Sequence, residues 1–233
     1  MSVSPEKPDP EALDAATVRF LRRRTWLNPD LRLLLWEGQL SVAKDWGKSI
    51  LLMRIYGRWN LRREWKLLQK LKGIQGVPDP LSRTGDAIVM TYLEGTPLSN
   101  RLAVELQSEF FPRLEQLVSD IHERGVVHLD LRQRRNILFG ANSEPMILDF
   151  GAGLDLSGWG WLGWVGLSWL SFLDRMAVLK HKVKYAPDQV TPSERNRAIW
   201  AKKARYFWPP NWFHVIKTRI RRYLRNVQES PED

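Results

Sequence analysis

The residues best suited to chemistry gather around one stretch, VVHLDLRQRRNILFG, residues 126–140. In it Asp130 and Asn136 stand on either side of five residues, LRQRR, and Asp149 follows at the end of a second apolar run, MILDFG. Carboxylate and amide oxygens are the donors that hard cations such as Mg²⁺ prefer. Asp149 also has a structural explanation, because an Asp at the end of a strand can simply cap a turn. The elements around these residues must therefore be considered with them.

The surrounding sequence predicts strands first and helices later. Residues 31–46, LRLLLWEGQLSVAKDW, contain two short apolar runs around Glu37-Gly38, which predicts two strands and a turn. Three further elements are expected beyond them: a helix in NLRREWKLLQKLKG (60–73), a β-rich run at 85–95 and a helix in EFFPRLEQLVSDIHERG (109–125). The site residues then lie on a hairpin spanning 136–151. This order predicts an α+β fold with two lobes.

Composition limits the function classes. The chain has 233 residues, 43% of them hydrophobic, which is enough for a sizeable core. It has no cysteine, which excludes thiol nucleophiles, disulfides and cysteine metal sites. A formal net charge of +10 indicates an anionic partner, such as a nucleotide, nucleic acid or acidic lipid surface. The first residues, MSVSPEKPDPEALDAA, do not have the pattern of a secretory signal and predict a disordered arm, so we expect a cytoplasmic protein.

The order of these parts resembles the protein-kinase-like superfamily. It is most similar to the small bacterial lipopolysaccharide core (Kdo/heptose) kinases and the RIO-type atypical kinases. The matching pieces lie between Leu31 and Gly151, roughly half of the chain: Lys44 in SVAKDW, Glu64 in LRREW, the connector MTYLEGTPLS, the run IHERGVVHLDL, Asn136, and Asp149-Phe150-Gly151. The resemblance rests on their order and spacing, since each piece alone is weak. It implies a two-lobed protein-kinase-like α+β fold with a reduced C-terminal lobe.

The resemblance also implies a nucleotide site. Lys44 would hold the α- and β-phosphates of ATP, and Glu64 would orient the lysine ammonium. Thr91 and Leu93, in the connector, would contact the nucleotide. Taken singly, Lys44 would more simply be a strand-edge surface lysine and Glu64 a solvated helix residue.

By the same resemblance, the stretch after residue 126 would carry the transfer chemistry. Phosphoryl transfer needs positioning and charge neutralisation more than covalent chemistry. Asp149 and Asn136 would bind Mg²⁺, and Asp130 would accept the proton of the acceptor hydroxyl and align it. Arg132 would meet the γ-phosphate, and His128 would support the loop through hydrogen bonds.

Two departures from the kinase pattern stand out. Residues 18–43 contain only Gly38 where a glycine-rich phosphate-covering loop is expected, so Asn28 or backbone amides would replace it, or the phosphates are less tightly covered. The G-x-G-x-x-G that begins at Gly158 follows the Asp-Phe-Gly and is not that loop. The second departure is one extra residue between Asp130 and Asn136. An irregular loop can bulge outward at little entropic cost, so we expect a working loop. Its basic RQRR run either anchors an anionic acceptor or is simply solvated.

The second half of the chain departs further. No A-P-E follows the Asp-Phe-Gly, and a long regulated activation segment is not expected. Thr191-Pro-Ser-Glu194 forms a capping box that predicts a helix in SERNRAIWAKKARYFW (193–208). The charge-free segment Leu156–Leu173 carries four tryptophans among seven Gly and Ser residues. That composition favours an interfacial or lid-like segment over a membrane span, with a Trp-rich core segment as the alternative. Residues 212–227 predict a basic amphipathic helix.

From these features we expect a disordered arm (1–17), an N-lobe (18–94), a C-lobe (95–228) and a tail (229–233). The expected function is ATP- and Mg²⁺-dependent phosphorylation of a hydroxyl, on an envelope lipopolysaccharide sugar at the inner membrane surface. The protein would then be cytoplasmic with peripheral attachment to anionic lipid. Two alternatives are a RIO-like Ser/Thr protein kinase and a membrane-docked pseudokinase that binds ATP without transfer. Nucleic-acid binding is the weakest alternative, because the sequence contains no recognisable RNA- or DNA-binding module.

Overall fold

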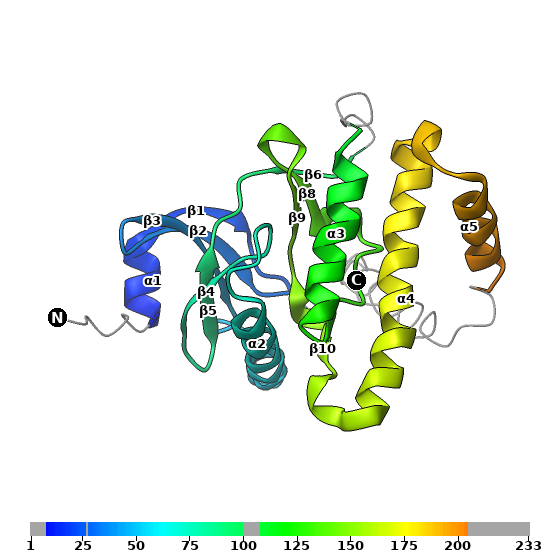
Figure 1. Cartoon of the computed structure of the whole chain (residues 1–233). Coiled ribbons are helices and arrows are strands. Elements are labelled where there is room, and N and C mark those ends of the chain that lie inside the picture. Colours follow the sequence, from blue (N-terminus) through cyan, green and yellow to red (C-terminus); the bar gives the residue numbers. More distant parts are fainter. Residues whose placement is uncertain (1–7, 27, 100–107, 205–233) are drawn as a thin grey trace, which may run out of the picture. The chain divides into compact units, whose positions relative to one another are not determined.

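The protein is described from a computed structural model, which covers residues 8–26, 28–99 and 108–204 (Figure 1). The chain divides into two compact units, residues 1–189 and 190–233. The first unit contains every residue that the sequence predicts to take part in chemistry.

The described part of the second unit is helix α5, Pro192–Ala204. It begins at the predicted capping box. The Thr191 backbone N–H donates to Glu194 Oε2 at 2.8 Å, and the Glu194 N–H donates to Thr191 Oγ1 at 3.3 Å. The box is therefore confirmed. The predicted basic helix at 212–227 lies outside the described residues.

A five-stranded antiparallel sheet forms the small lobe of the first unit, in the spatial order β1-β2-β3-β5-β4. The strands are β1 Thr17–Arg22, β2 Asp30–Trp36, β3 Gln39–Asp45, β4 Pro80–Arg83 and β5 Ala87–Thr91. The predicted turn between β2 and β3 is confirmed. Glu37 and Gly38 have φ of 47° and 77°, and a two-residue hairpin loop with positive φ at both positions matches the twist of the flanking strands.

One face of this sheet is covered by helix α1, Pro10–Ala16. The prediction of a disordered arm over residues 1–17 is therefore wrong for its second part. Asp9 caps the helix by accepting the Ala12 N–H at 2.8 Å. Leu13 is buried in a cluster with Leu34, Trp36, Ala43, Ala87 and Val89. The buried leucine and the cap help to hold this short helix in place, and neither gives a strong periodic signal in the sequence.

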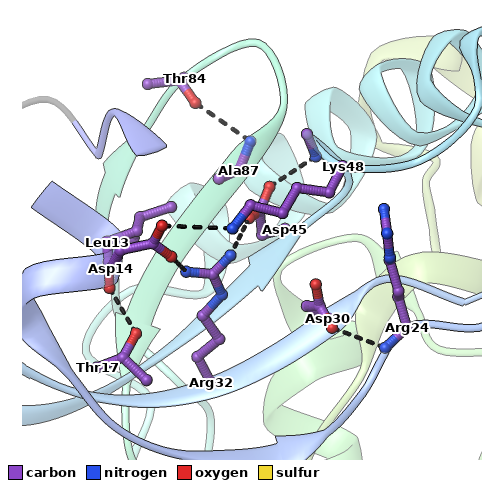
Figure 2. Close-up of polar contacts among 11 residues, drawn as sticks. Leu13, Asp14, Thr17, Arg24, Asp30, Arg32, Asp45, Lys48, Thr84 and Ala87 are labelled. Atoms are coloured by element: carbon purple, nitrogen blue, oxygen red, sulfur yellow. Dashed lines mark hydrogen bonds and ion pairs between the residues drawn. The ribbon is translucent and has the colours of Figure 1, made fainter. Parts of the chain in front are cut away.

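Arg32 ties α1 to the sheet, as Figure 2 shows. Its side chain is 1% exposed and lies between two carboxylates. It donates to Asp45 on β3 at 2.8 Å and to Asp14 on α1. Asp14 also accepts from Lys48 at 3.3 Å. The Arg32 network, defined here as Arg32, Asp14, Asp45 and Lys48, thus joins α1, two strands and the loop before the next helix.

Helix α2, Leu51–Leu71, packs on the opposite side of the small lobe. It starts nine residues before the predicted helix at 60–73, and its first turns expose Leu51, Ile55 and Trp59. Gly57 is required where α2 meets the sheet, because a Cβ there would lie 2.4 Å from the Trp46 ring. The helix turns Leu61, Leu68 and Leu71 into the core and carries Glu64 in its buried face.

The large lobe follows in residues 95–189. Helix α3, Phe110–Glu123, buries Phe110, Phe111 and Leu114 on its inner face, as the helical spacing predicts. The predicted hairpin is confirmed, with β8 (Ile137–Phe139) paired to β9 (Pro145–Ile147). The remaining short strands are β6 Thr96–Pro97, β7 Val126–Val127 and β10 Leu154–Asp155; β10 pairs with β7 and β6 with β8.

The chain passes from Gly151 to helix α4, Gly160–Tyr185, through residues 152–159 alone. This leaves no room for a long activation segment between them. The segment Leu156–Leu173, predicted to be interfacial or lid-like, forms a short 3-10 turn followed by the first half of α4. Trp161, Val165, Trp169 and Phe172 are between 46% and 74% exposed, which also excludes a Trp-rich core at these positions. Within the described ranges, no helix combines the length and apolar character that a membrane crossing requires.

Candidate active site

The centre of the site is a buried lysine between two carboxylates. Lys44 on β3 extends its Nζ to Glu64 Oε2 at 2.7 Å and to Asp149 Oδ1 at 2.9 Å. The Lys44 and Glu64 side chains are 9% and 2% exposed, whereas that of Asp149 is 45% exposed. The structure thus brings together three residues separated by up to 105 positions in the sequence. The expected pairing of Lys44 with Glu64 is present.

The charges in this cluster support one another. Burial alone would lower the pKa of the Lys44 ammonium, but Asp149 and Glu64 raise it above its ordinary value. The Lys44 charge lowers the pKa of Asp149, which therefore stays ionised at neutral pH. Burial raises the pKa of Glu64, and the charge of Lys44 opposes that effect. We infer a lysine that is charged at neutral pH and oriented by one buried and one solvent-facing carboxylate.

Asp149 is held in an uncommon backbone conformation. Its φ of 63° and ψ of 70° lie in the left-handed region, which a non-glycine residue adopts only when its surroundings enforce it. The next residues are tied to α2, because Asn60 Nδ2 donates to the Gly151 carbonyl at 3.0 Å and Arg63 donates to the same oxygen. The helix that carries Glu64 therefore also fixes the turn that presents Asp149.

The loop from Asp130 to Asn136 accommodates its extra residue in two successive turns. The Gln133 N–H donates to the Asp130 carbonyl at 3.2 Å, and the Asn136 N–H donates to the Gln133 carbonyl at 2.9 Å. Leu131, which directly follows Asp130, is 1% exposed and anchors the loop in the core. The insertion therefore changes the turn chemistry without separating Asp130 from Asn136. Asn136 Nδ2 still donates to Asp130 Oδ2 at 3.0 Å and to its carbonyl at 3.1 Å.

The Asp130 carboxylate is only partly engaged. Gln133 Nε2 and Asn136 Nδ2 both donate to its Oδ2. No described residue donates to Oδ1, and the residue is half-buried. An oxygen in this state can accept a hydrogen bond from a hydroxyl that enters the site. The geometry thus leaves Asp130 able to do what the resemblance implies.

His128 and Asp174 hold the loop in place through hydrogen bonds. His128 Nε2 donates to the Leu148 carbonyl at 3.0 Å, and the Asp130 N–H donates to His128 Nδ1 at 3.2 Å, which confirms the structural role expected of this histidine. Asp174 on α4 accepts the backbone N–H groups of His128 and Leu129 at 2.7 and 2.8 Å, and it contacts His122 Nε2 at 3.1 Å. Leu129 is thereby held at a φ of 63°, immediately before Asp130.

The oxygen donors of Asn136 and Asp149 fit a magnesium ion. Asn136 turns its amide nitrogen to Asp130, which leaves its side-chain oxygen for a cation. The Leu148 N–H donates to the Asn136 carbonyl at 2.8 Å, so Asn136 and Asp149 stand at neighbouring ends of the β8–β9 hairpin. No cluster of three or more His, Cys, Asp or Glu occurs in the part of the chain that the structure covers. Two protein oxygens are sufficient for Mg²⁺, which usually keeps waters and takes phosphate oxygens as further ligands.

The other predicted site residues have clear positions. Arg132 is exposed on the loop two residues beyond Asp130. Thr91 ends β5, where its N–H donates to the Asp79 carbonyl and its Oγ1 accepts the Asp79 N–H, both at 2.9 Å. Leu93 follows in the half-buried connector between the lobes. A role in nucleotide contact stays a prediction for Thr91 and Leu93, as does phosphate contact for Arg132.

The sequence did not reveal every residue of the site. Asp174 lies 45 residues beyond Leu129 in an aromatic-rich helix, and no local motif marks it. Asn60 and Arg63 stand next to Glu64 in sequence, but their bonds to Gly151 depend on how α2 packs. The one available signal was that Asp174 directly follows the charge-free segment Leu156–Leu173. A carboxylate there could be buried, and an ionised side chain in a core requires partners.

Comparison with known proteins agrees with this geometry. The family model of the RIO domain matches residues 48–158, a range that includes Glu64, Asp130, Asn136 and Asp149. Two solved structures of the Rio2 kinase from Chaetomium thermophilum, one of them an ADP/Mg²⁺-phosphoaspartate complex, are similar to this chain. Each has 15% sequence identity, a TM-score of 0.53 and 75% coverage of this chain.

The chain covers 58% and 60% of those Rio2 kinase chains, less than two thirds of their length. At this identity the likeness concerns the fold. The predicted two-lobed protein-kinase-like fold with a small lobe is confirmed. Of the two groups that the sequence resembles, the comparisons support the RIO type.

Proposed function

We propose that this protein-kinase-like chain of the RIO type is a phosphotransferase that moves the γ-phosphoryl group of ATP to a hydroxyl. The observation that carries the proposal is the Lys44–Glu64–Asp149 cluster. It places a charged ammonium beside a solvent-facing carboxylate, next to a loop with a free carboxylate oxygen on Asp130. Phosphoryl transfer requires this combination of fixed positive charge, metal-ligating oxygen and hydroxyl acceptor.

Each side chain would have a separate task. Lys44, oriented by Glu64, would bind phosphate oxygens of the nucleotide. Asp130 would accept the hydrogen bond of the acceptor hydroxyl through Oδ1. It would take the proton as the new P–O bond forms and the bond from the γ-phosphorus to the bridging oxygen of the leaving ADP breaks. Asn136 and Asp149 would hold Mg²⁺, which when bound would neutralise phosphate charge. Arg132, exposed beside Asp130, would contact the transferred phosphoryl group.

For the acceptor we propose a sugar hydroxyl of the envelope lipopolysaccharide, reached from the inner membrane surface. The exposed residues Trp161, Val165, Trp169 and Phe172 recur at helical spacing along α4 and form one apolar stripe. Tryptophan prefers the membrane–water interface, and a basic protein is attracted to anionic lipid. The stripe therefore supports peripheral attachment of a cytoplasmic protein.

A protein hydroxyl is the second candidate acceptor, favoured by the RIO-domain match. The two classes are separated by incubating the protein and γ-labelled ATP with envelope fractions and with soluble protein fractions of the same cells. We expect Mg²⁺-dependent label in the glycolipid fraction. Label confined to protein would identify the protein kinase alternative. Binding of ATP without label in any fraction would indicate the pseudokinase alternative.

A further inference from the structure

The small lobe presents a second cation to the nucleotide site, Arg22 at the end of β1. The sequence offers no glycine-rich loop at this position, so the phosphates of a bound nucleotide lack their usual backbone cover. The register of the sheet aligns Arg22 with the site. Arg22 pairs with Leu31 on β2, and Leu31 pairs with Lys44 on β3. Directly paired residues project from the same face of a sheet, so Arg22 and Lys44 share one face.

A β-bulge is responsible for this orientation. Phe20 pairs with Arg32, and a regular antiparallel ladder would then pair Arg22 with Asp30, on the face that α1 covers. The register shift between Phe20 and Arg22 pairs Arg22 with Leu31 instead. Because alternate residues of a strand face opposite sides, this one-residue slip moves the guanidinium from the α1 side to the side of Lys44.

The distance between Arg22 and Lys44 would allow both side chains to bind one ligand. Two strand spacings separate Arg22 from Lys44, or about 10 Å between their backbones. Both side chains are long enough to converge on one triphosphate from such a separation. The two cations thus flank the region that the nucleotide phosphates would occupy.

The Nε of Arg22 is buried and has no hydrogen-bond partner within the described residues. Burial is the main cause that lowers the pKa of the guanidinium. Asp149 opposes this effect, whereas Arg135, in the loop between Asp130 and Asn136, adds to it. Arg22 is half-buried, its Nε has no described partner, and another arginine lies nearby. A bound anion would supply the missing hydrogen-bond acceptor and a balancing negative charge.

We propose that Arg22 binds the phosphate groups of the nucleotide and takes the place of the missing glycine-rich loop. This inference rests on the proposed function and adds a phosphate-binding residue to the same site. A side chain of the β1–β2 hairpin would then contact the phosphates, whereas a glycine-rich loop would contact them through its backbone amides. The guanidinium suits this task because its planar donors can bind two phosphate oxygens at once.

Arg23 provides a matched control. Its guanidinium stacks 3.5 Å from the centroid of the Phe20 ring, and Phe20 pairs with Arg32 on the face away from Lys44. Arg23→Gln therefore removes the same charge from the same hairpin without touching the proposed phosphate contact. Arg22→Lys keeps the charge and loses the planar donors.

The test is isothermal titration calorimetry of the full chain with MgATP and with adenosine, for wild type, Arg22→Gln, Arg22→Lys and Arg23→Gln. We expect Arg22→Gln to weaken MgATP binding by roughly 10- to 100-fold, the range for charged hydrogen bonds, and to leave adenosine binding unchanged. Arg22→Lys should fall between Arg22→Gln and wild type, and Arg23→Gln should match wild type. Thermal denaturation of each variant checks that the fold is kept.

Three results would overturn the inference. The first is wild-type affinity of Arg22→Gln for MgATP, and the second is an equal loss of MgATP and adenosine binding. The third is an equal effect of Arg23→Gln, which would indicate a general charge effect. Each of these leaves the proposed function standing, as long as wild type binds MgATP. A wild-type chain that binds no MgATP would remove the proposed function and this inference together.

Discussion

The two faces of the small-lobe sheet carry clusters with the same pattern of charge. On one face Arg32 lies between Asp45, which is buried, and Asp14, which is half-exposed. On the other face Lys44 lies between Glu64, which is buried, and Asp149, which is half-exposed. In each cluster a buried cation meets two carboxylates, one supplied by a helix. Composition and burial alone therefore do not distinguish a structural ion cluster from a functional one.

What surrounds each cluster separates them. The Arg32 network is closed by α1, and Lys48 adds a further partner to its exposed carboxylate. The Lys44 cluster contains Asp149, which has a left-handed conformation, and it lies beside an open carboxylate oxygen on Asp130. Backbone strain and an open carboxylate oxygen, rather than buried charge, thus distinguish the face that we propose to be functional.

The largest expected effect is loss of catalysis on the Lys44 face. Asp149→Ala should abolish Mg²⁺-dependent transfer, and Asp130→Ala should lower the rate by roughly 10²- to 10⁴-fold, the range for general acid–base groups. Nucleotide binding should be largely kept in Asp130→Ala. Transfer of labelled phosphate is the measurement. Asp14→Asn is the matched control from the other face and should retain the wild-type rate, whereas wild-type rates in both site variants would refute the assignment.

The Arg32 network should show the opposite response. Arg32→Leu leaves Asp45 buried without its cation, and removing one partner of a buried pair typically costs about 3–5 kcal/mol of unfolding free energy. Asp14→Asn should cost only about 0–1 kcal/mol, because that carboxylate is half-exposed. Urea denaturation measures both. The contrast between the two faces fails if Arg32→Leu leaves stability unchanged.

Lys44 and Glu64 should behave as one unit. Either change to Ala should weaken the productive positioning of ATP, since Nζ and Oε2 are 2.7 Å apart and both groups are buried. The double variant should be little worse than the poorer single variant, because residues in contact are not additive. Comparison of kcat/KM for the four proteins gives the coupling. Fully additive losses would mean that the pair does not act together during turnover.

Lowering the pH should destabilise the large lobe through protonation of His181. Its Nε2 donates to the Leu131 carbonyl at 2.9 Å, its Nδ1 is buried without a described partner, and burial lowers its pKa to about 4. Because the folded pKa lies below the unfolded value, this stabilisation is complete above pH 6.5 and is lost as the pH falls toward 4. The loss is at most about 3 kcal/mol. His181→Leu should flatten this part of the stability–pH curve, and an unchanged curve would contradict the prediction.

The smallest expected effect concerns membrane attachment. Trp161→Ala combined with Trp169→Ala should weaken co-sedimentation with anionic vesicles several-fold, because both indoles are exposed on α4. Trp26→Ala, an equally exposed tryptophan of the small lobe, is the control. Added salt should weaken the binding by screening. Equal binding to neutral and anionic vesicles would argue against an electrostatic contribution to docking.

The sequence predicted the parts of the site that depend on local order. Asp130, Asn136 and Asp149 lie on one loop and hairpin, and Lys44 and Glu64 follow strand and helix patterns. Asp174 and Arg22 were not predicted. The first acts through a contact between distant helices, and the second owes its orientation to a β-bulge. Such effects arise from packing and register, which residue periodicity does not encode.

The central claim is that the Lys44 face, and not the Arg32 face, binds the nucleotide. Its most direct test is calorimetric titration of MgATP into wild type, Lys44→Met and Arg32→Lys, repeated with EDTA. We expect wild type and Arg32→Lys to bind with similar affinity, Lys44→Met to bind at least about 10-fold more weakly, and EDTA to weaken binding wherever it occurs. Wild-type affinity in Lys44→Met, or no binding by wild type, would contradict the claim.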